Sequence, residues 1–150
     1  PEIPKYVDVK RYFIENNINS PTLLQIRNAI MDIRKEKLPD PKKISNVGSF
    51  FKNPIIKKDF LLSIGTTYGE ISYFKIDENF IKIPAGWLIE KAGLKGKSFG
   101  NVSSYEKNAI VLVNNGNATY EDIISVHDLI VKAVHQKFGI TLEQEPEIVS

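Results

Sequence analysis

The stretch Gly48-Ser49-Phe50-Phe51-Lys52-Asn53-Pro54 carries the most information about this chain, and the run Lys37-Leu38-Pro39-Asp40-Pro41 precedes it. Proline on both sides predicts a segment that begins and ends abruptly instead of continuing as a helix. In an extended segment Ser49, Phe51 and Asn53 would share one face, because successive side chains of a strand alternate. A hydroxyl and a carboxamide beside an aromatic ring suit a polar ligand. An ordinary amphipathic strand with Ser49 in a turn is the alternative.

The composition is that of an ordinary globular protein with one domain. The chain has 150 residues, of which 42% are hydrophobic and 25% are charged, and this length allows a substantial core. The formal net charge of +2 is too small to indicate nucleic-acid binding by itself. The absence of cysteine excludes disulfides and thiolate metal sites.

Neither a membrane segment nor a signal peptide is predicted. The longest wholly apolar run is Ala109–Val113, far shorter than the ~18 residues that a membrane-spanning helix needs. The N-terminal residues show no signal-peptide pattern. We therefore expect a cytoplasmic protein without a membrane partner.

The pattern of apolar residues and turn formers predicts an α+β fold in which helices and short strands are interleaved. Ser20 followed by Pro21, and Thr119 with Asp122 three residues later, are typical of helix starts. The expected helices cover residues 9–16, 21–38, 54–62, 84–92 and 120–138. The expected strands or extended segments cover residues 49–53, 80–83, 109–113 and 141–149, the last interrupted by Pro146.

Three blocks of the sequence resemble the C-terminal part of the UDP-N-acetylenolpyruvoylglucosamine reductase family. They are Lys37–Pro54, then Pro84–Glu90 with Leu94-Lys95-Gly96, and finally Leu142-Glu143-Gln144-Glu145. The blocks stand in the family's order and at compatible spacing, and the similarity extends over nearly the whole chain. It implies that residues 1–150 form the substrate-binding C-terminal region, a single α+β domain. The family's N-terminal FAD-binding region, which is absent from this chain, would be its partner.

The resemblance also implies a reaction. The family reduces UDP-N-acetylglucosamine enolpyruvate to UDP-N-acetylmuramate for peptidoglycan, with FAD as cofactor and NADPH as reductant. Hydride from reduced flavin adds to the enolpyruvyl double bond, and a serine supplies the proton. Ser49 matches that catalytic serine, and a hydroxyl is a suitable proton donor to an enolic or carbanionic centre. Without the flavin region, we expect this chain to show no reductase activity and no tight FAD binding.

A second catalytic position falls in the last block. Glu145 matches the family's active-site glutamate, which helps to stabilise or protonate the enolic intermediate. Pro146 follows Glu145 where the family more often has an aliphatic residue, and the alternative register selects Glu143 instead. The sequence leaves both glutamates open.

The other matches concern the bound UDP-sugar. Lys37 matches the lysine that contacts the diphosphate, and Asn53 matches an asparagine that hydrogen-bonds the same ligand. Tyr6 resembles a tyrosine on a mobile loop that closes over the substrate, and Tyr73 resembles a tyrosine near the uridine. Further substrate-binding positions are expected at Arg34, Lys95 and Asn108. For Lys95, Asn108 and the nearby Lys82, a solvated surface group is the alternative.

No metal site is expected, because His127 and His135 lie eight residues apart without a cysteine or a third imidazole. No GxGxxG or P-loop motif is present. Two other functions remain open. One is a non-catalytic module that binds a UDP-sugar or another nucleotide, in which Ser49 would be incidental. The other is a nucleic-acid or protein interaction domain that uses Lys42-Lys43 and Lys57-Lys58. The basic residues form no continuous stripe, so we expect no nucleic-acid partner.

Overall fold

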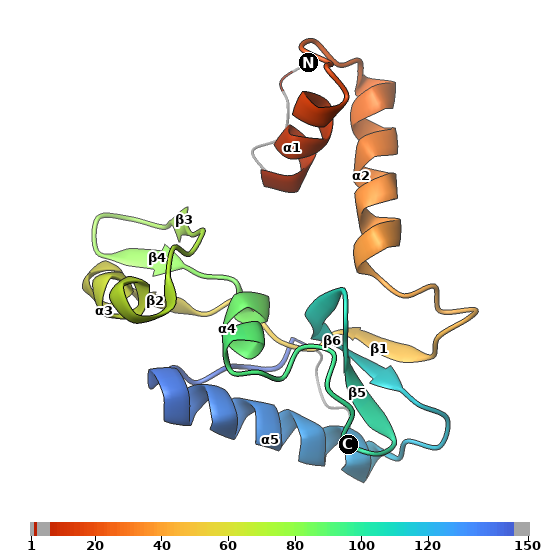
Figure 1. Cartoon of the computed structure of the whole chain (residues 1–150), viewed down its shortest axis with the longest axis vertical. Coiled ribbons are helices and arrows are strands. Elements are labelled where there is room, and N and C mark those ends of the chain that lie inside the picture. Colours follow the sequence, from red (N-terminus) through yellow and green to blue (C-terminus); the bar gives the residue numbers. More distant parts are fainter. Residues whose placement is uncertain (1, 3–6, 146–150) are drawn as a thin grey trace. The chain divides into compact units, whose positions relative to one another are not determined.

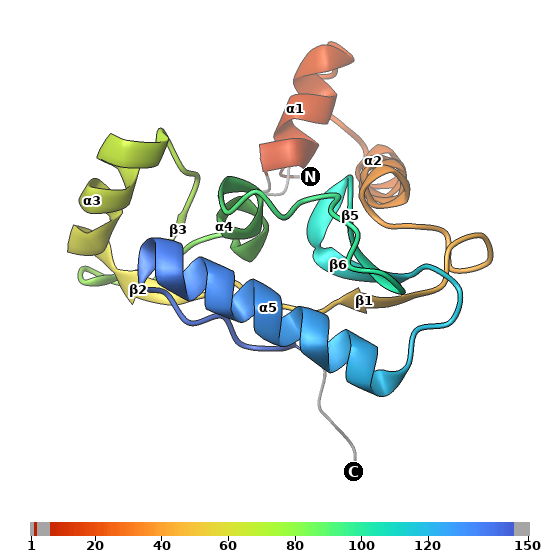
Figure 2. The same cartoon turned by 60° about the horizontal axis from the view of Figure 1, so that its bottom comes forward.

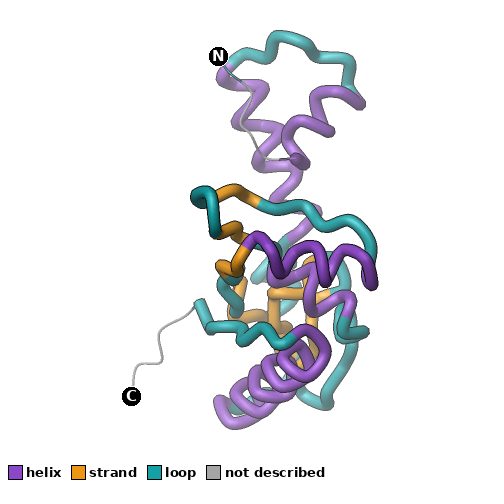
Figure 3. Tube along the Cα trace, turned by 90° about the vertical axis from the view of Figure 1, so that its left-hand side faces the viewer, coloured by secondary structure: helices purple, strands orange, loops and turns teal. Residues whose placement is uncertain are grey.

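The computed structural model describes residues 2 and 7–145, and the chain divides at Asp40 into two compact units. The first unit is Pro1–Asp40 and the second is Pro41–Ser150. Within the described residues the first unit contains only helices, and every strand belongs to the second (Figures 1 and 3). Residues 1, 3–6 and 146–150, which include Tyr6 and Pro146, lie outside the described residues. No helix within the described ranges is long and apolar enough to cross a membrane.

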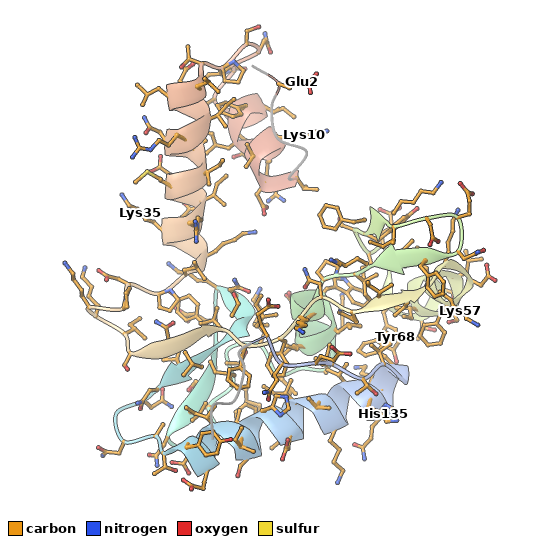
Figure 4. All side chains as sticks on the ribbon, turned by 180° about the vertical axis from the view of Figure 1, so that it is seen from behind. Glu2, Lys10, Lys35, Lys57, Tyr68 and His135 are labelled. Atoms are coloured by element: carbon orange, nitrogen blue, oxygen red, sulfur yellow. The ribbon has the colours of Figure 1, made fainter. Side chains whose placement is uncertain are left out.

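The first unit consists of α1 (Val7–Glu15) and α2 (Leu23–Lys37). Its core is small. Val9 and Phe13 of α1 are buried together with Ile26 and Ala29 of α2. Most other side chains of these helices are exposed to solvent, including Lys10 and Lys35 (Figure 4).

The start of α2 corrects the predicted cap at Ser20. Thr22 is the N-cap, where its Oγ1 accepts a hydrogen bond from the Gln25 backbone N–H at 3.2 Å. The Gln25 side chain in turn accepts a hydrogen bond from the Thr22 N–H at 2.8 Å. This capping box satisfies two backbone donors at once, whereas a helix that began at Pro21 would forgo the second bond. Pro21 is buried ahead of the helix instead.

The first sheet of the second unit has three strands in the order β1-β6-β5, all antiparallel. They are β1 (Asn46–Ser49), β5 (Val102–Tyr105) and β6 (Asn108–Asn114). The helices α4 (Ala85–Lys91) and α5 (Tyr120–Phe138) pack on this part of the unit. In Figure 2 the long helix α5 runs past this sheet, and the chain that follows it turns back alongside the helix.

The second sheet also has three antiparallel strands, in the order β2-β4-β3. They are β2 (Ile55–Lys57), β3 (Phe74–Lys75) and β4 (Phe80–Lys82), and α3 (Lys58–Tyr68) follows β2 directly. The helix predicted over residues 54–62 is therefore wrong in its first part. The β-branched pair Ile55 and Ile56 suits a strand, and pairing with β4 satisfies its backbone. Figure 4 labels Lys57, the last residue of β2, and Tyr68, the last residue of α3.

The helix α5 agrees with its prediction because its signals are local. Thr119 and Asp122 form a capping box, and Gly139 ends the helix with a positive φ of 70°. Apolar side chains at helical spacing are buried at Val126, Ile130, Val134 and Phe138. Hydrogen bonds from the Thr119 backbone N–H and the Asn101 side chain lower the pKa of Asp122 below its ordinary value of 3.8.

One hydrophobic core runs through the second unit. It joins both sheets to α3, α4 and α5. Its members that are fully buried are Ile81 and Ile83 around β4, Ala85, Leu88 and Ile89 on α4, and Ile130 and Val134 on α5. The expectation of an α+β fold is confirmed. This core is what holds the ends of β1 and β2 in place around the candidate site.

Candidate functional site

Ser49 lies at the end of β1, directly after a β-bulge. Asn46 pairs with Val113 and Ser49 pairs with Val111, so β1 contains one residue more than β6 over this interval. Gly48 supplies the extra residue with a positive φ of 71°, and its N–H donates to Asn46 Oδ1 at 2.8 Å. A bulge of this kind bends the strand and changes the direction of the next side chains. Ser49 is exposed.

Phe50 and Phe51 anchor the segment after Ser49. Both are buried, and their rings pack against the imidazole of His127 on α5, with centroid distances of 5.6 and 5.5 Å. The strand predicted over residues 49–53 has the wrong bounds, because β1 covers Asn46–Ser49. The expected alternation of faces also fails, because Phe50 and Phe51 are consecutive and both buried.

The C-terminal segment returns to this anchor and pairs with it. The Glu145 N–H donates to the Phe50 carbonyl, and the Lys52 N–H donates to the Glu143 carbonyl, both at 2.8 Å. The pairing is antiparallel. As a result Ser49 immediately precedes a residue that is hydrogen-bonded to Glu145, although the two lie in blocks far apart in the sequence.

A cavity of about 510 Å³ opens beside this pairing. It is lined by charged and polar side chains together with a few apolar ones: Lys52, Asn53, Pro54, Ile55, Lys82, Thr141, Glu143 and Glu145. Two ammonium groups thus balance two carboxylates. Amide and hydroxyl groups nearby add hydrogen-bonding capacity. This chemistry suits a polar ligand that carries acidic groups.

Both glutamates of the last block line the cavity. They are two residues apart on an extended segment, and such residues point to the same side. The cavity therefore does not separate the two registers that the sequence left open. The cavity also includes Lys82, and it includes Lys52 and Thr141, which sequence reasoning missed. Lys52 lies within the stretch Gly48–Pro54, whose motif could have pointed to it. Thr141 is identified only by the tertiary structure.

Asn53 connects the cavity to α4. Its Oδ1 accepts a hydrogen bond from the Ala85 N–H at 2.9 Å. Pro84 occupies the N-cap position of α4 without any side-chain cap of its own, so Asn53 supplies the missing acceptor. Because the Oδ1 atom accepts the Ala85 N–H, the side-chain amide nitrogen of Asn53 is available to donate a hydrogen bond to a ligand.

Two predicted ligand-binding residues belong to the first unit. Lys37 is the last residue of α2, and its ammonium pairs with the carboxylate of Asp8 on α1. Arg34 lies one turn earlier and is exposed. Tyr6 lies outside the described residues.

The remaining predicted residues lie in the second unit but do not line this cavity. Tyr73 lines a separate hollow of about 650 Å³ beside α3. Lys95 follows α4 and pairs with Glu90 at 3.3 Å. Asn108 begins β6, opposite Tyr105. Among the described residues no group of three or more side chains could hold a metal ion.

A family model and individual proteins of known sequence both match this chain, and they carry the same name. The sequence model described as "UDP-N-acetylenolpyruvoylglucosamine reductase, C-terminal domain" matches residues 40–149. Proteins named UDP-N-acetylenolpyruvoylglucosamine reductase are similar over most of this chain. That of Flavobacterium johnsoniae is 44% identical over 144 residues, which is 96% of this chain and 43% of the relative. That of Azoarcus sp. (strain BH72) is 41% identical over 147 residues, 98% of this chain and 42% of the relative.

A third relative, from Buchnera aphidicola, is 47% identical over 127 residues, 84% of this chain and 38% of the relative. The α+β unit with its polar cavity falls in the class of C-terminal domains that this family model describes. The chain belongs to the UDP-N-acetylenolpyruvoylglucosamine reductase family. It spans less than half the length of the relatives that it matches.

Proposed function

We propose that this chain is the substrate-binding part of a reductase that converts UDP-N-acetylglucosamine enolpyruvate to UDP-N-acetylmuramate. The family membership supports this assignment. The observation that carries it is the pairing of residues 50–52 with residues 143–145. This pairing joins the two blocks that hold the proposed catalytic residues, Ser49 and Glu145. Glu145 lines the polar cavity, whereas Ser49 is not part of its lining.

In this proposal the side chains have distinct tasks. The Ser49 hydroxyl donates a proton to the carbon next to the substrate carboxylate, and Glu145 stabilises or protonates the enolic intermediate. Lys37 contacts the diphosphate, and Asn53 hydrogen-bonds the same ligand. Tyr73 lies near the uridine, and the remaining proposed contacts to the UDP-sugar come from Tyr6, Arg34, Lys95 and Asn108.

The cofactor contacts are proposed to lie outside this chain. We assign the cavity to the UDP-sugar, because its lysine, asparagine and threonine side chains can bind diphosphate, carboxylate and hydroxyl groups. We assign no cofactor contact to its lining. In the complete enzyme FAD, reduced by NADPH, would supply the hydride. The N-terminal FAD-binding region would be the partner of this chain, and the chain alone would be inactive.

Titration of the isotope-labelled chain with UDP-N-acetylglucosamine enolpyruvate tests this proposal. We expect backbone amide shifts at Ser49–Asn53 and Glu143–Glu145, with further shifts at Lys37 and Tyr73. Uridine monophosphate is the control ligand, and it should perturb Tyr73 but not the Glu145 region. An unperturbed spectrum at millimolar ligand would contradict binding by the isolated chain. A yellow purified protein would contradict the assignment of the flavin to another region.

A further inference from the structure

Glu143 and Glu145 both line the cavity, but they differ in their positions in the pairing between residues 50–52 and residues 143–145. The two backbone hydrogen bonds between these segments lie on either side of the directly opposed pair Phe51 and Gln144. Lys52 therefore lies opposite Glu143, and Phe50 lies opposite Glu145. Directly opposed residues of an antiparallel pair are close neighbours on one face of the sheet. Lys52, Glu143 and Glu145 all line the cavity, which agrees with this register.

The two carboxylates therefore have different neighbours. Glu143 has Lys52 directly opposite it in the backbone register, and opposite charges at directly opposed positions attract each other. Glu145 is opposed by Phe50, which is 6% exposed and packs against Phe51 and His127. The cross-strand neighbour of Glu145 is thus an apolar ring.

The charge balance of the cavity makes Lys52 important for an acidic ligand. Lys52 and Lys82 together offset the charges of the two glutamates. Loss of either lysine leaves a net negative cavity, which repels an anion. A flexible lysine binds best when a fixed partner restricts its conformations, because ordering a long side chain on binding costs entropy.

We propose that Lys52 is a further ligand-binding residue, which contacts a phosphate or carboxylate group of the ligand, and that Glu143 is the positioning residue that orients it. This inference rests on the proposed function and deepens it. It leaves Glu145 as the acid available to the reacting part of the substrate. It thereby assigns separate roles to the two glutamates of the last block.

A double-mutant cycle on the full 150-residue chain tests the pair. The variants are Lys52→Gln, Glu143→Gln and their combination, and the measured quantities are the dissociation constant for UDP-N-acetylglucosamine enolpyruvate and the urea midpoint of unfolding. We expect Lys52→Gln to weaken binding by about tenfold and Glu143→Gln by about threefold. The double variant should bind as Lys52→Gln does, because Glu143 acts through Lys52. Lys52→Arg should restore most of the affinity.

The exposed pair Lys75 and Glu78, joined at 3.0 Å outside the cavity, provides the matched control. Lys75→Gln and Glu78→Gln should leave the dissociation constant unchanged. The control variants and the cavity variants should both shift the urea midpoint only slightly. A second cycle that combines Lys52→Gln with Glu145→Gln should be additive. Additive effects of Lys52 and Glu143, or tighter binding by Glu143→Gln, would overturn the inference.

Inorganic pyrophosphate separates this inference from the proposed function. If the wild-type chain binds pyrophosphate but not the UDP-sugar, the proposed substrate is wrong, and the same cycle with pyrophosphate decides the role of the pair. Non-additive effects of the Lys52 and Glu143 substitutions on pyrophosphate affinity would then support the proposed roles of the two residues. Additive effects would refute them. Binding of neither probe would overturn both proposals.

Discussion

The side chain of Asn53 lies between the cavity and the first turn of α4. Its oxygen accepts from the Ala85 N–H, and the residue also lines the cavity. In the proposed function, one amide group would thus link the stability of a helix end to ligand binding. The two tasks use different atoms, so substitutions can separate them.

We predict that Asn53→Asp preserves the fold but impairs binding. An aspartate still accepts the Ala85 N–H, while its negative charge replaces a donor and repels an acidic ligand. Asn53→Ala loses the acceptor and should reduce the free energy of unfolding by about 0.5–2 kcal/mol. Urea denaturation and the NMR titration measure the two effects separately. The control is Asn117→Asp in the exposed turn before α5. Unchanged affinity of Asn53→Asp would refute the donor role.

Gly48 matters at the scale of strand β1, because the bulge that precedes Ser49 depends on its backbone. Its positive φ of 71° is a conformation that residues with a Cβ adopt at a cost. An added Cβ would meet nothing within 4 Å, so the cost comes from the backbone and not from a clash.

Gly48→Ala should therefore lower the free energy of unfolding by about 1–2 kcal/mol. Gly65→Ala is the matched control, since Gly65 lies inside α3, its Cβ position is also open, and its φ is not positive. This second change should stabilise the chain by about 0.5–1 kcal/mol. Urea denaturation measures both. Equal effects of the same sign would show that the strain at Gly48 does not govern this strand.

The N-terminus of α5 should contribute a pH-dependent part of the stability. Hydrogen bonds from the Thr119 N–H and from Asn101 lower the pKa of Asp122 in the folded state. A lowered folded-state pKa means that the unfolded chain takes up the proton first as the pH falls. The stabilisation is complete above the ordinary value of 3.8 and is lost as the pH falls from there through the lower folded-state pKa.

Asp122→Asn should therefore flatten the loss of stability below about pH 4. The asparagine oxygen can still accept from Thr119, so the helix itself should persist. Thermal midpoints between pH 2.5 and 7 test this expectation, with Glu121→Gln in the same first turn of α5 as the control. Parallel pH profiles for the wild type and Asp122→Asn would contradict it.

At the scale of the whole molecule, the two units differ in what holds them together. The first unit buries one small cluster between α1 and α2. The second has a core that joins all of its helices and both sheets. Short isolated helices are only marginally stable in water, so the second unit is expected to be the independently stable one.

We predict that residues 41–150 fold on their own, with amide chemical shifts close to those of the same residues in the full chain. Residues 1–40 alone should show little helical circular dichroism at 25 °C. If Lys37 binds the diphosphate and Arg34 contacts the UDP-sugar as proposed, residues 41–150 should bind the UDP-sugar more weakly than the full chain. If the amide shifts of residues 41–150 alone show the poor dispersion of an unfolded chain, the second unit needs the first in order to fold.

Several elements could be predicted from sequence because their determinants are local. Thr119, Asp122 and Gly139 bound α5, and its apolar stripe is buried. The strand predicted over residues 109–113 is the centre of β6. By contrast, β2 was predicted as the start of a helix. There the local signals of Pro54 compete with pairing to β4, and long-range pairing overrides a weak local preference.

The sequence by itself determined the family, the α+β class and most helix bounds, because motifs, caps and periodicity act over a few neighbouring residues. Only the tertiary structure decided that the last block pairs with Phe50–Lys52, that Asn53 caps α4 and that Lys52 opposes Glu143. The reason is physical. Contacts between distant segments form where they bury apolar groups such as Phe50 and Phe51 and satisfy backbone hydrogen bonds, and that balance depends on the entire core.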